Sequence, residues 1–417
     1  MFNHLKNWVS NTSYLLLFAT NLGGVLINSA TKCHAYGSLK NYPKVPSPEP
    51  LGSYPPGDAI FLLKDIAPSI QEQGNEERER AIQSGRHYSE MLPIEYEPSQ
   101  EYIDLFHRSL LETGQRLALA TAIVSETILK KRGKGVVLVS LARAGTPIGV
   151  LVKKYIYQFH GIDVPHYSIS IIRDKGIDKN ALAYILQNHP GCEIQFIDGW
   201  TGKGAITTEL IKSVTEFEKE FNMLPDTISK ELAVLADPGC CANIFGTRDD
   251  FLIPSACLNS TVSGLMSRTV CREDLIGPID FHGAKFYREL LDKDLSNYFV
   301  DTVASYFLDA QKKALIMLQN KPHVGIDETP AWLGKKETTK VQMEFGIHNI
   351  NYVKPGVGET TRVLLRRVPW KILVKDMKSA DIKHVLLLAE DRGVPVEEYP
   401  ELSYSCYGLI KNLEDTK

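Results

Sequence analysis

The chain has 417 residues, of which 43% are hydrophobic and 23% charged, a composition typical of a soluble globular protein with room for two or three domains. Its net charge of -3 excludes a global attraction to nucleic acid, so any polyanion must be bound by a local group of cations. The seven cysteines form no regular framework and no Cys-x-x-Cys pair, which favours a reducing cytoplasm and argues against a thiolate zinc site.

Residues 1–50 differ from the rest of the chain. Lys6 precedes an apolar stretch, residues 14–27, which has the shape of a signal peptide but is interrupted by Thr20 and Asn21. It is too short and too polar for a confident membrane span, so no stable membrane contact is expected. The apolar stretch is equally well explained by an N-terminal extension or by a start codon assigned too far upstream, and this interpretation is favoured. The proline-rich residues 42–50 predict an extended linker.

Residues 51–325 alternate between two patterns. Helical spacing of apolar residues occurs at 101–131, 147–159, 178–188 and 205–221, and strand-like runs occur at 136–140, 166–172, 193–198 and 232–237. The alternation predicts an α/β fold with a doubly wound, mostly parallel sheet. In such sheets ligands bind beyond the carboxyl ends of the strands. The charged run 76–80 predicts a solvated helix face.

The third strand ends in an acid and a glycine-rich turn. Asp198 is followed by Gly199, Gly202 and Gly204, and a helix is expected to start at Ala205. Such a turn leaves main-chain N–H groups unpaired at the positive end of the helix dipole, which favours a phosphate. Thr201 adds a hydroxyl donor. Lys203 is followed by Gly204 rather than Ser or Thr, which excludes a Walker loop, and an ordinary strand-to-helix connection is the alternative.

Cations follow the other predicted strands. Arg143 comes after the first strand, Arg173 and Lys175 follow the second, and Lys203 follows the third. Carboxyl ends of parallel strands share one edge of the sheet, so these side chains predict a polyphosphate pocket. Taken singly, Arg143 could cap a helix and Lys175 could face water.

These loops resemble those of the phosphoribosyltransferase fold. Arg143, Ala144 and Gly145 match the pyrophosphate loop, and Asp198 matches the acid that holds the ribose hydroxyls. The loop for the 5-phosphate is matched by Thr201, Gly202, Lys203, Gly204 and Ala205. A second acid usually follows the first, but Gly199 stands there. The resemblance implies phosphoribosyl pyrophosphate or a related ribosyl phosphate as substrate and Mg²⁺ as cofactor. It also implies catalytic roles: Arg143 and Arg173 would stabilise the charge on the leaving pyrophosphate as the ribose becomes oxocarbenium-like, and Asp198 would orient the sugar.

A rival site lies further along the chain. Cys257 and His282, oriented by Asp280 or Asn259, have the residue types of a cysteine nucleophile and its base. Thiolate chemistry needs His beside Cys to lower the thiol pKa. A buried, inert cysteine is the simpler interpretation.

The span from residue 52 to about 318 resembles the StiP-like proteins, which are often labelled cysteine proteases and occur in bacterial tellurium-resistance and stress gene clusters. The likeness is carried by residues 196–205, 253–264 and 281–288. It implies a stress or tellurium-resistance role. The family label indicates a protease, whereas the predicted fold indicates a transferase. The transferase interpretation is preferred because a phosphate-binding loop gives a peptidase no obvious advantage.

Residues 326–417 predict a separate module. Breaks at Gly325 and Pro330 mark the boundary, and residues 351–383 carry eight Lys or Arg against three acids. Such a basic patch favours nucleic acid, with a solvated lysine face as the alternative.

The order of its elements, with a helix opening at 354–362, a strand at 370–374, a helix at 382–391 and a strand at 394–396, resembles a small α/β/α Pelota-type RNA-binding domain. Glu359 matches the acidic residue that recognises guanine in these domains, and Arg362 matches the basic residue that binds the RNA backbone. Lys354 is expected to bind RNA as well. Gly358 replaces an asparagine, and N–H groups of Gly356 and Gly358 are expected to meet phosphates. Val394 and Pro395 match the loop that packs on an extruded base.

Three functions follow from these patterns. The leading one is a cytoplasmic phosphoribosyltransferase-like enzyme with an RNA-binding tail. The second is a thiol hydrolase that uses Cys257 and His282, and the third is a non-catalytic sensor of nucleotide and RNA.

Overall fold

The computed structural model describes residue 39 and residues 42–95, 97–321 and 323–410. The apolar stretch 14–27 lies outside the described residues. Residues 42–50 have no regular secondary structure, as expected of a linker, but they pack on the large domain instead of standing free. The Tyr42 hydroxyl donates to Asn180 Oδ1 over 2.5 Å, and Val45 is buried.

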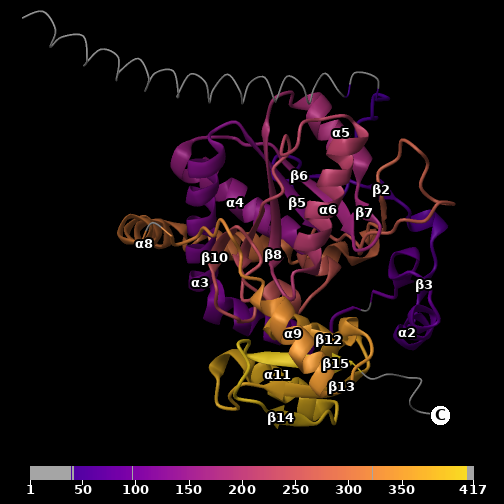
Figure 1. Ribbon diagram of the computed structural model, residues 1–417, viewed down its shortest axis with the longest axis vertical. Coiled ribbons are helices and arrows are strands. Elements are labelled where there is room, and N and C mark those ends of the chain that lie inside the picture. The colour runs from indigo at the N-terminus through magenta and orange to yellow at the C-terminus, as the bar shows by residue number, and fades with distance from the viewer. Residues whose placement is uncertain (1–38, 40–41, 96, 322, 411–417) are drawn as a thin grey trace, which may run out of the picture.

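A mostly parallel sheet forms the centre of the large domain (Figure 1). In spatial order its parallel strands are β1 (Ile60–Leu62), β6 (His166–Ile172), β5 (Val136–Ala142), β8 (Glu193–Trp200), β9 (Leu232–Ala236) and β10 (Ile244–Thr247), with β7 (Gly176–Ile177) antiparallel to β6. The four predicted strands are confirmed; β5 and β8 each run two residues further than expected, and β9 ends one residue earlier. Val139 of β5 lies opposite Phe196 of β8, so the carboxyl ends of these two strands meet.

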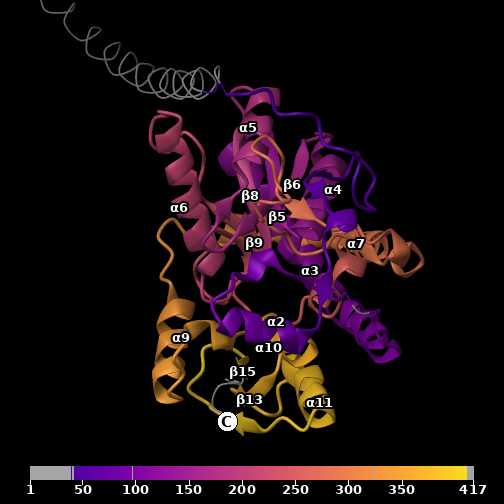
Figure 2. The same cartoon turned by 90° about the vertical axis from the view of Figure 1, so that its right-hand side faces the viewer.

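Helices cover both faces of this sheet (Figures 1 and 2). Apolar faces of α3 (Gln100–Arg132), α4 (Gly145–His160), α7 (Ser296–Ala304) and α8 (Phe307–Asn320) join one core, and those of α5 (Lys179–Asn188) and α6 (Ala205–Glu220) join the other. Along β5, Val136 and Leu138 point into the first core, while Val137 and Val139 point into the second. Burial on both faces explains the continuous apolar run.

Short elements frame this layered core. They are β2 (Lys64–Asp65), η1 (Ala67–Ser69), β3 (Glu72–Gln73), α2 (Asn75–Gln83), η2 (Tyr88–Glu90), β4 (Leu92–Pro93), η3 (Pro254–Ala256), η4 (Ser260–Val262), β11 (Gly283–Ala284) and η5 (Arg288–Lys293). The pairs β11 with β2 and β3 with β4 form two small sheets at the side of the large one.

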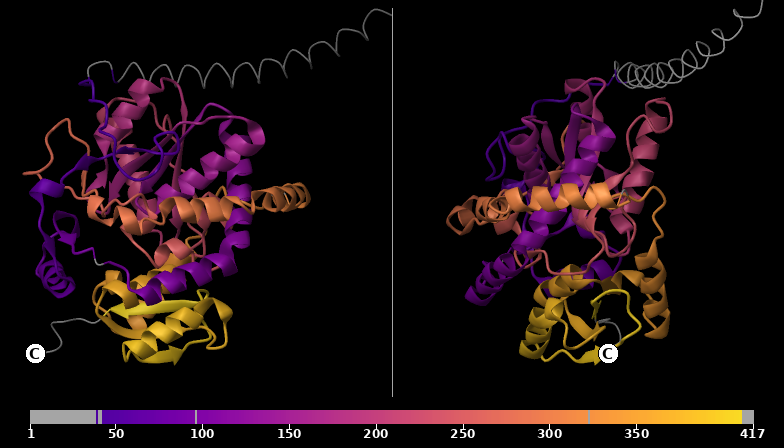
Figure 3. Two further views of the ribbon diagram at one scale, coloured as in Figure 1. Left: turned by 180° about the vertical axis from the view of Figure 1, so that it is seen from behind. Right: turned by 90° about the vertical axis from the view of Figure 1, so that its left-hand side faces the viewer.

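The C-terminal residues fold as a small domain at one end of the large one (Figure 3). Its sheet has the order β12 (Val353–Pro355), β15 (Cys406–Ile410), β13 (Pro369–Val374) and β14 (Val396–Glu398). The helices α10 (Val357–Arg366) and α11 (Lys383–Asp391) pack on one face, and α9 (Leu333–Glu344) packs on the other, with η6 (Ile350–Tyr352) and η7 (Ala380–Ile382) in the connections. The predicted helices are confirmed, whereas the last predicted strand starts two residues later.

Contacts between the domains hold α10 at the carboxyl end of β8. Asp250 of the large domain accepts from Val357 N at 2.9 Å and from Ser405 N at 2.8 Å, and the Tyr404 hydroxyl donates to Gly202 O at 3.0 Å. The Asp250 carboxylate therefore takes the place at the start of α10 that a phosphate was expected to fill. Burial raises the pKa of Asp250 to about 7, although these two N–H donors act against it.

Candidate functional site

Two adjoining cavities lie between the carboxyl ends of the strands and α10 of the small domain. The first has a volume of about 470 Å³ and the second about 350 Å³. Both are lined by the same central group of residues: Arg78, Tyr88, Ala144, Asp198, Ile206, Arg268, Lys354, Glu359, Arg362 and Arg367. Cavities therefore lie at the sheet edge where the sequence predicted a ligand site. The small domain forms the wall of these cavities that faces the strand ends.

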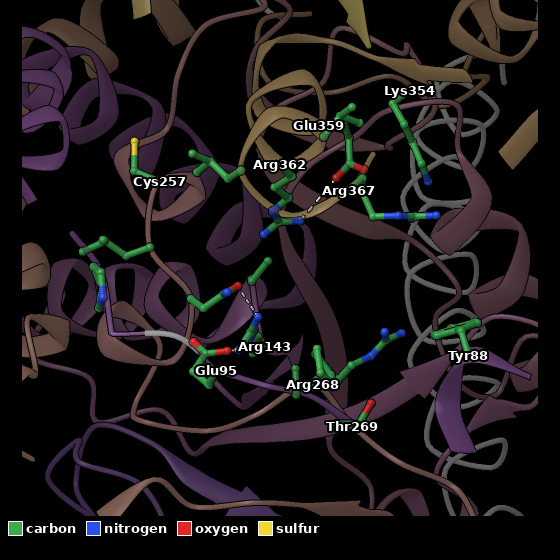
Figure 4. Close-up of a pocket in the computed structure, with 18 of the residues that line it drawn as sticks. Tyr88, Glu95, Arg143, Cys257, Arg268, Thr269, Lys354, Glu359, Arg362 and Arg367 are labelled. Carbon is green, nitrogen blue, oxygen red and sulfur yellow. Dashed lines mark hydrogen bonds and ion pairs between the residues drawn. The ribbon is translucent and has the colours of Figure 1, made fainter. Parts of the chain in front are cut away.

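Arg143 lines the first cavity from the end of β5, as predicted (Figure 4). Its guanidinium donates to Met266 O at 3.2 Å and to Asn259 Oδ1, and it lies 3.8 Å from the Glu95 carboxylate. Burial lowers the pKa of Arg143, although Glu95 acts against it. These contacts fix the direction of the guanidinium, and the cation gains from any anion that enters.

Gly145 brings the two predicted loops together. A Cβ at this position would lie 2.4 Å from Ile197 O and 3.1 Å from Asp198 Cα, so α4 can start beside β8 only with glycine there. Neither Gly145 nor Gly199 lines a cavity; both are buried between the loops. Their role in this structure is close packing rather than ligand contact.

Asp198 lies where the two cavities meet. Its Oδ1 accepts from Gly199 N at 2.8 Å. Burial, and to a lesser extent Glu359, raise the pKa of Asp198 to about 7, while Gly199 N–H and Arg362 act against this. The side chain therefore changes charge near neutral pH.

The glycine-rich loop lines the second cavity through residues 201–205, as predicted. The N–H groups of residues 202–207 meet no acceptor among the residues that the structure describes, as expected at the start of α6. The expectation for the Thr201 hydroxyl is wrong, because this group is not a free donor. It donates to Asp237 Oδ1 and so holds the loop in place.

Lys203 supplies a second cation to this loop. Its Nζ donates to Ile350 O at 2.7 Å and to Asn351 Oδ1 at 3.1 Å, and Arg173 donates to the same Asn351 oxygen at 2.8 Å. Burial, together with Lys354 and Arg173, lowers the pKa of Lys203 to about 7. A phosphate in this cavity would relieve the repulsion among these cations.

We expect phosphate binding to weaken as pH rises, because Lys203 loses its proton through pH 7 while Asp198 gains a negative charge in the same range. Between pH 7 and 9, where a phosphate ester is already dianionic, the Kd of ribose 5-phosphate measured by calorimetry should rise roughly tenfold. The rise should be smaller in Lys203→Met, where only Asp198 still titrates. An equal rise in both proteins would contradict this role for Lys203.

Arg78 of α2 was missed from the sequence. It was taken as part of a solvated face, but it is only 8% exposed and lines both cavities. A run of alternating charges carries no signal of direction, so sequence alone could not place it. Arg268 also lines both cavities; its guanidinium lies 4.5 Å from the centre of the Tyr88 ring, and burial and Arg78 lower its pKa.

Three of the residues assigned to RNA recognition point toward the cavities. Lys354, Glu359 and Arg362 line both of them, and Arg362 lies 4.5 Å from the centre of the Trp200 ring. A Cβ on Gly358 would lie 2.9 Å from Trp200 Cε2, so glycine permits this close packing. That its N–H meets an RNA phosphate stays a prediction.

Gly356 is also used internally, since its N–H donates to Cys406 O at 2.8 Å. Val394 and Pro395 line neither cavity: Val394 packs on the core, and Pro395 O accepts from Ile372 N at 3.0 Å. The structure therefore does not bring this loop together with Lys354 and Glu359.

The predicted basic patch of the small domain is divided. Lys354, Arg362 and Arg367 face the cavities, whereas Lys375, Lys378 and Lys383 are exposed. The exposed group remains a surface for a large polyanion. A linear count of charges cannot separate the two groups.

The predicted Cys257 dyad is not assembled. Cys257 is 3% exposed and lines the first cavity, and Figure 4 shows it at the margin of the drawn side chains, away from Arg268 and Tyr88. His282 Nδ1 instead lies 2.9 Å from Ser170 Oγ, and Asp280 forms an ion pair with Lys64 at 2.5 Å. Both proposed partners of Cys257 are thus engaged elsewhere.

His282 lies beside a different cysteine. A side-chain hydrogen bond from His282 lowers the pKa of Cys271, which is half-buried. Burial by itself lowers the pKa of His282, but Asp178 and Cys271 outweigh it and the pKa is raised. Asp178 also accepts from His282 N at 2.5 Å. This Cys–His–Asp group lines neither cavity.

The part of the chain that the structure describes contains no cluster of three metal-ligating side chains. Mg²⁺ usually keeps several waters and binds one or two carboxylates together with substrate phosphates, so Asp198 and Glu359 are the side chains that fit it. Among the described helices, none is long and apolar enough to cross a lipid bilayer.

The fold and site define a mixed α/β protein whose mostly parallel sheet ends in a cation-lined cavity covered by a small C-terminal domain. Residues 52–304 match the family described as tellurite-like stress resistance cysteine protease StiP, and residues 332–412 match the PELOTA RNA binding domain. The "Cysteine protease StiP" of Acinetobacter baylyi is 35% identical over 357 residues, which cover 83% of this chain and 90% of that protein. The chain belongs to the StiP family.

Proposed function

We propose that this protein is a phosphoribosyltransferase-like enzyme that binds phosphoribosyl pyrophosphate or a related ribosyl phosphate. The cavities carry this proposal: eight cationic side chains line them (Arg78, Arg143, Arg173, Lys203, Arg268, Lys354, Arg362 and Arg367) against four acids (Glu95, Glu97, Asp198 and Glu359). This local excess of cationic side chains favours an anionic ligand. The strand order, with helices on both faces, supports a phosphoribosyltransferase-like doubly wound fold.

The proposed chemistry is electrostatic. The 5-phosphate would bind the free N–H groups of residues 202–205 and Lys203, and Asp198 would accept hydrogen bonds from the ribose hydroxyls. Arg143 would stabilise the charge that develops on the leaving pyrophosphate, and Arg173 would hold the phosphate side of the second cavity. Mg²⁺, when bound with the substrate, would neutralise pyrophosphate oxygens.

Titration of the full chain with phosphoribosyl pyrophosphate, followed by an assay of pyrophosphate release, tests this function. Binding together with release, stimulated by an added acceptor, is the expected result. Binding without turnover for any acceptor would favour the sensor of nucleotide and RNA. Absence of binding in the presence of Mg²⁺ would overturn the proposal.

A thiol hydrolase is the second candidate, because the family description and the Acinetobacter relative's name both specify a cysteine protease. The thiol that fits is Cys271, since His282 lies beside it, rather than Cys257. In this candidate Cys271 would attack a carbonyl carbon, and His282 would pass the proton to the leaving amine.

We expect iodoacetamide at pH 7 to alkylate Cys271 faster than Cys257, because the pKa of Cys271 is lowered and Cys257 is buried. Mass spectrometry of the peptides measures both rates. If the protein hydrolyses casein, Cys271→Ser should abolish hydrolysis and Cys257→Ser should not. Hydrolysis that survives Cys271→Ser would remove this candidate site.

RNA is the proposed macromolecular partner, because the small domain matches an RNA-binding domain. Lys375, Lys378 and Lys383 are exposed and available to an RNA backbone while α10 covers the cavities. Their contribution would be sequence-independent and would weaken with salt.

A further inference from the structure

Two carboxylates from different domains lie where the cavities join. Asp198 ends β8 of the large domain, Glu359 belongs to α10 of the small one, and each lines both cavities. Glu359 Cγ lies 3.9 Å from the position of a Cβ on Gly202, which places it beside the glycine-rich loop (Figure 4 shows the side chain with Arg362). The two carboxylates share this junction with five cations, Arg78, Arg268, Lys354, Arg362 and Arg367.

The other acids of the cavities are engaged. Glu95 Oε1 accepts from Ser260 N and Oγ, both at 2.8 Å, and Glu97 pairs with Lys293 at 3.0 Å. At the junction, Arg362 donates to Glu359 Oε1 at 3.3 Å, and Gly199 N donates to Asp198 Oδ1. Each of these two hydrogen bonds reaches one carboxylate oxygen, Oε1 of Glu359 and Oδ1 of Asp198. Both side chains therefore keep acceptor capacity for a ligand.

The side chains around the two carboxylates indicate what can bind beside them. Phosphates suit the cations on either side, Lys203 and Arg173 in one cavity and Arg143 in the other. The two carboxylates accept strongly from neutral hydroxyls. A ribose diol flanked by phosphate supplies both kinds of group.

We propose that Glu359 of the small domain supplies the second carboxylate of a ribose-diol site opposite Asp198, the acid that Gly199 does not provide. The small domain then completes the substrate site as well as covering it. This inference rests on the proposed function. A vicinal ribose diol with a neighbouring phosphate occurs in a free sugar phosphate and at the 3′ end of an RNA, and the experiment separates these sources.

Calorimetry of the full chain with ribose 5-phosphate and 2-deoxyribose 5-phosphate tests the site. The wild-type protein should prefer the ribose form by roughly ten- to hundredfold, as hydrogen bonds to charged groups allow. In Glu359→Gln this preference should fall at least about tenfold, while the affinity for the deoxy form stays within a factor of about two. Glu390→Gln, the same change at an exposed position of α11, should retain the wild-type preference.

An unchanged preference in Glu359→Gln would overturn the diol site and leave the proposed function standing. If the wild-type protein binds neither sugar phosphate nor phosphoribosyl pyrophosphate, the proposed function fails first. Retained affinity for the deoxy form and an unchanged melting temperature exclude misfolding of the variant.

A short single-stranded RNA with a free 3′-terminal diol, compared with the same RNA ending in a 2′,3′-dideoxy nucleotide, distinguishes the sources. Preference for the diol end that Glu359→Gln removes assigns the site to RNA ends. Equal binding of both RNAs, with the sugar phosphate preference intact, assigns it to free sugar phosphates. Discrimination in neither pair overturns the proposal.

Discussion

Arg143→Ala is expected to weaken binding of phosphoribosyl pyrophosphate by at least about a hundredfold. The guanidinium is oriented by Met266 O and Asn259 before any ligand arrives, so it makes charge-assisted hydrogen bonds at little entropic cost. Loss of such a preorganised donor typically costs about 3 to 4 kcal/mol, which is more than two orders of magnitude in affinity. Calorimetric titration in the presence of Mg²⁺ measures the change.

The variant also leaves Glu95 without its cationic neighbour, so a stability defect must be separated from a binding defect. In Arg143→Ala/Glu95→Gln the uncompensated acid is removed, and the melting temperature should recover while binding does not. Arg288→Ala, at an exposed arginine paired with Asp65 away from both cavities, should bind like the wild type. Wild-type affinity in Arg143→Ala would remove this residue from the ligand site.

Asp237→Ala is expected to lower the free energy of unfolding by about 3 to 5 kcal/mol, the largest stability effect that we predict. Asp237 is fully buried at the end of β9 and accepts from Thr201 Oγ1, from Cys241 N at 3.0 Å and from Ala242 N at 3.1 Å, and it also pairs with Arg248. Without the carboxylate, two buried N–H groups lack an acceptor, at about 1 to 3 kcal/mol each.

Urea denaturation measures this loss. Asp237→Asn should cost less, because it keeps an acceptor oxygen and because burial raises the pKa of Asp237, so that its ionised form is costly to bury. Asp391→Ala, at an exposed acid of α11, should change the free energy of unfolding by less than about 0.5 kcal/mol. A loss of similar size in Asp391→Ala and Asp237→Ala would show that the Asp237 network is not what stabilises the loop.

Asp237 stabilises part of the candidate site, because its carboxylate accepts a hydrogen bond from Thr201 Oγ1 in the glycine-rich loop. The loop was predicted from its glycines and from the helix that follows. Its hydroxyl was assigned to a ligand, however, because the sequence gives no sign that β9 ends beside it. The hydrogen-bond partner of this hydroxyl depends on which residue of the neighbouring strand lies beside it in the fold.

The sequence by itself determined the layered core and the positions of the loops. Continuous apolar runs such as residues 166–172 can be buried on both faces only in a covered parallel sheet, and helical spacing at 205–221 fixes the helix after the glycine turn. These signals are local, since period and turn residues act within a few positions along the chain. Arg143, Asp198 and Lys203 were found in this way.

Only the tertiary structure decided what faces those loops. Glu359 and Arg362 have the same local pattern whether α10 meets solvent, RNA or another domain, and they line the cavities because Asp250 and Trp200 hold α10 over the end of β8. His282 likewise lies beside Cys271 and not Cys257, because the chain returns past Ser170 of β6. Contacts between residues more than a hundred positions apart depend on the summed packing of whole elements, and no short stretch of sequence encodes that sum.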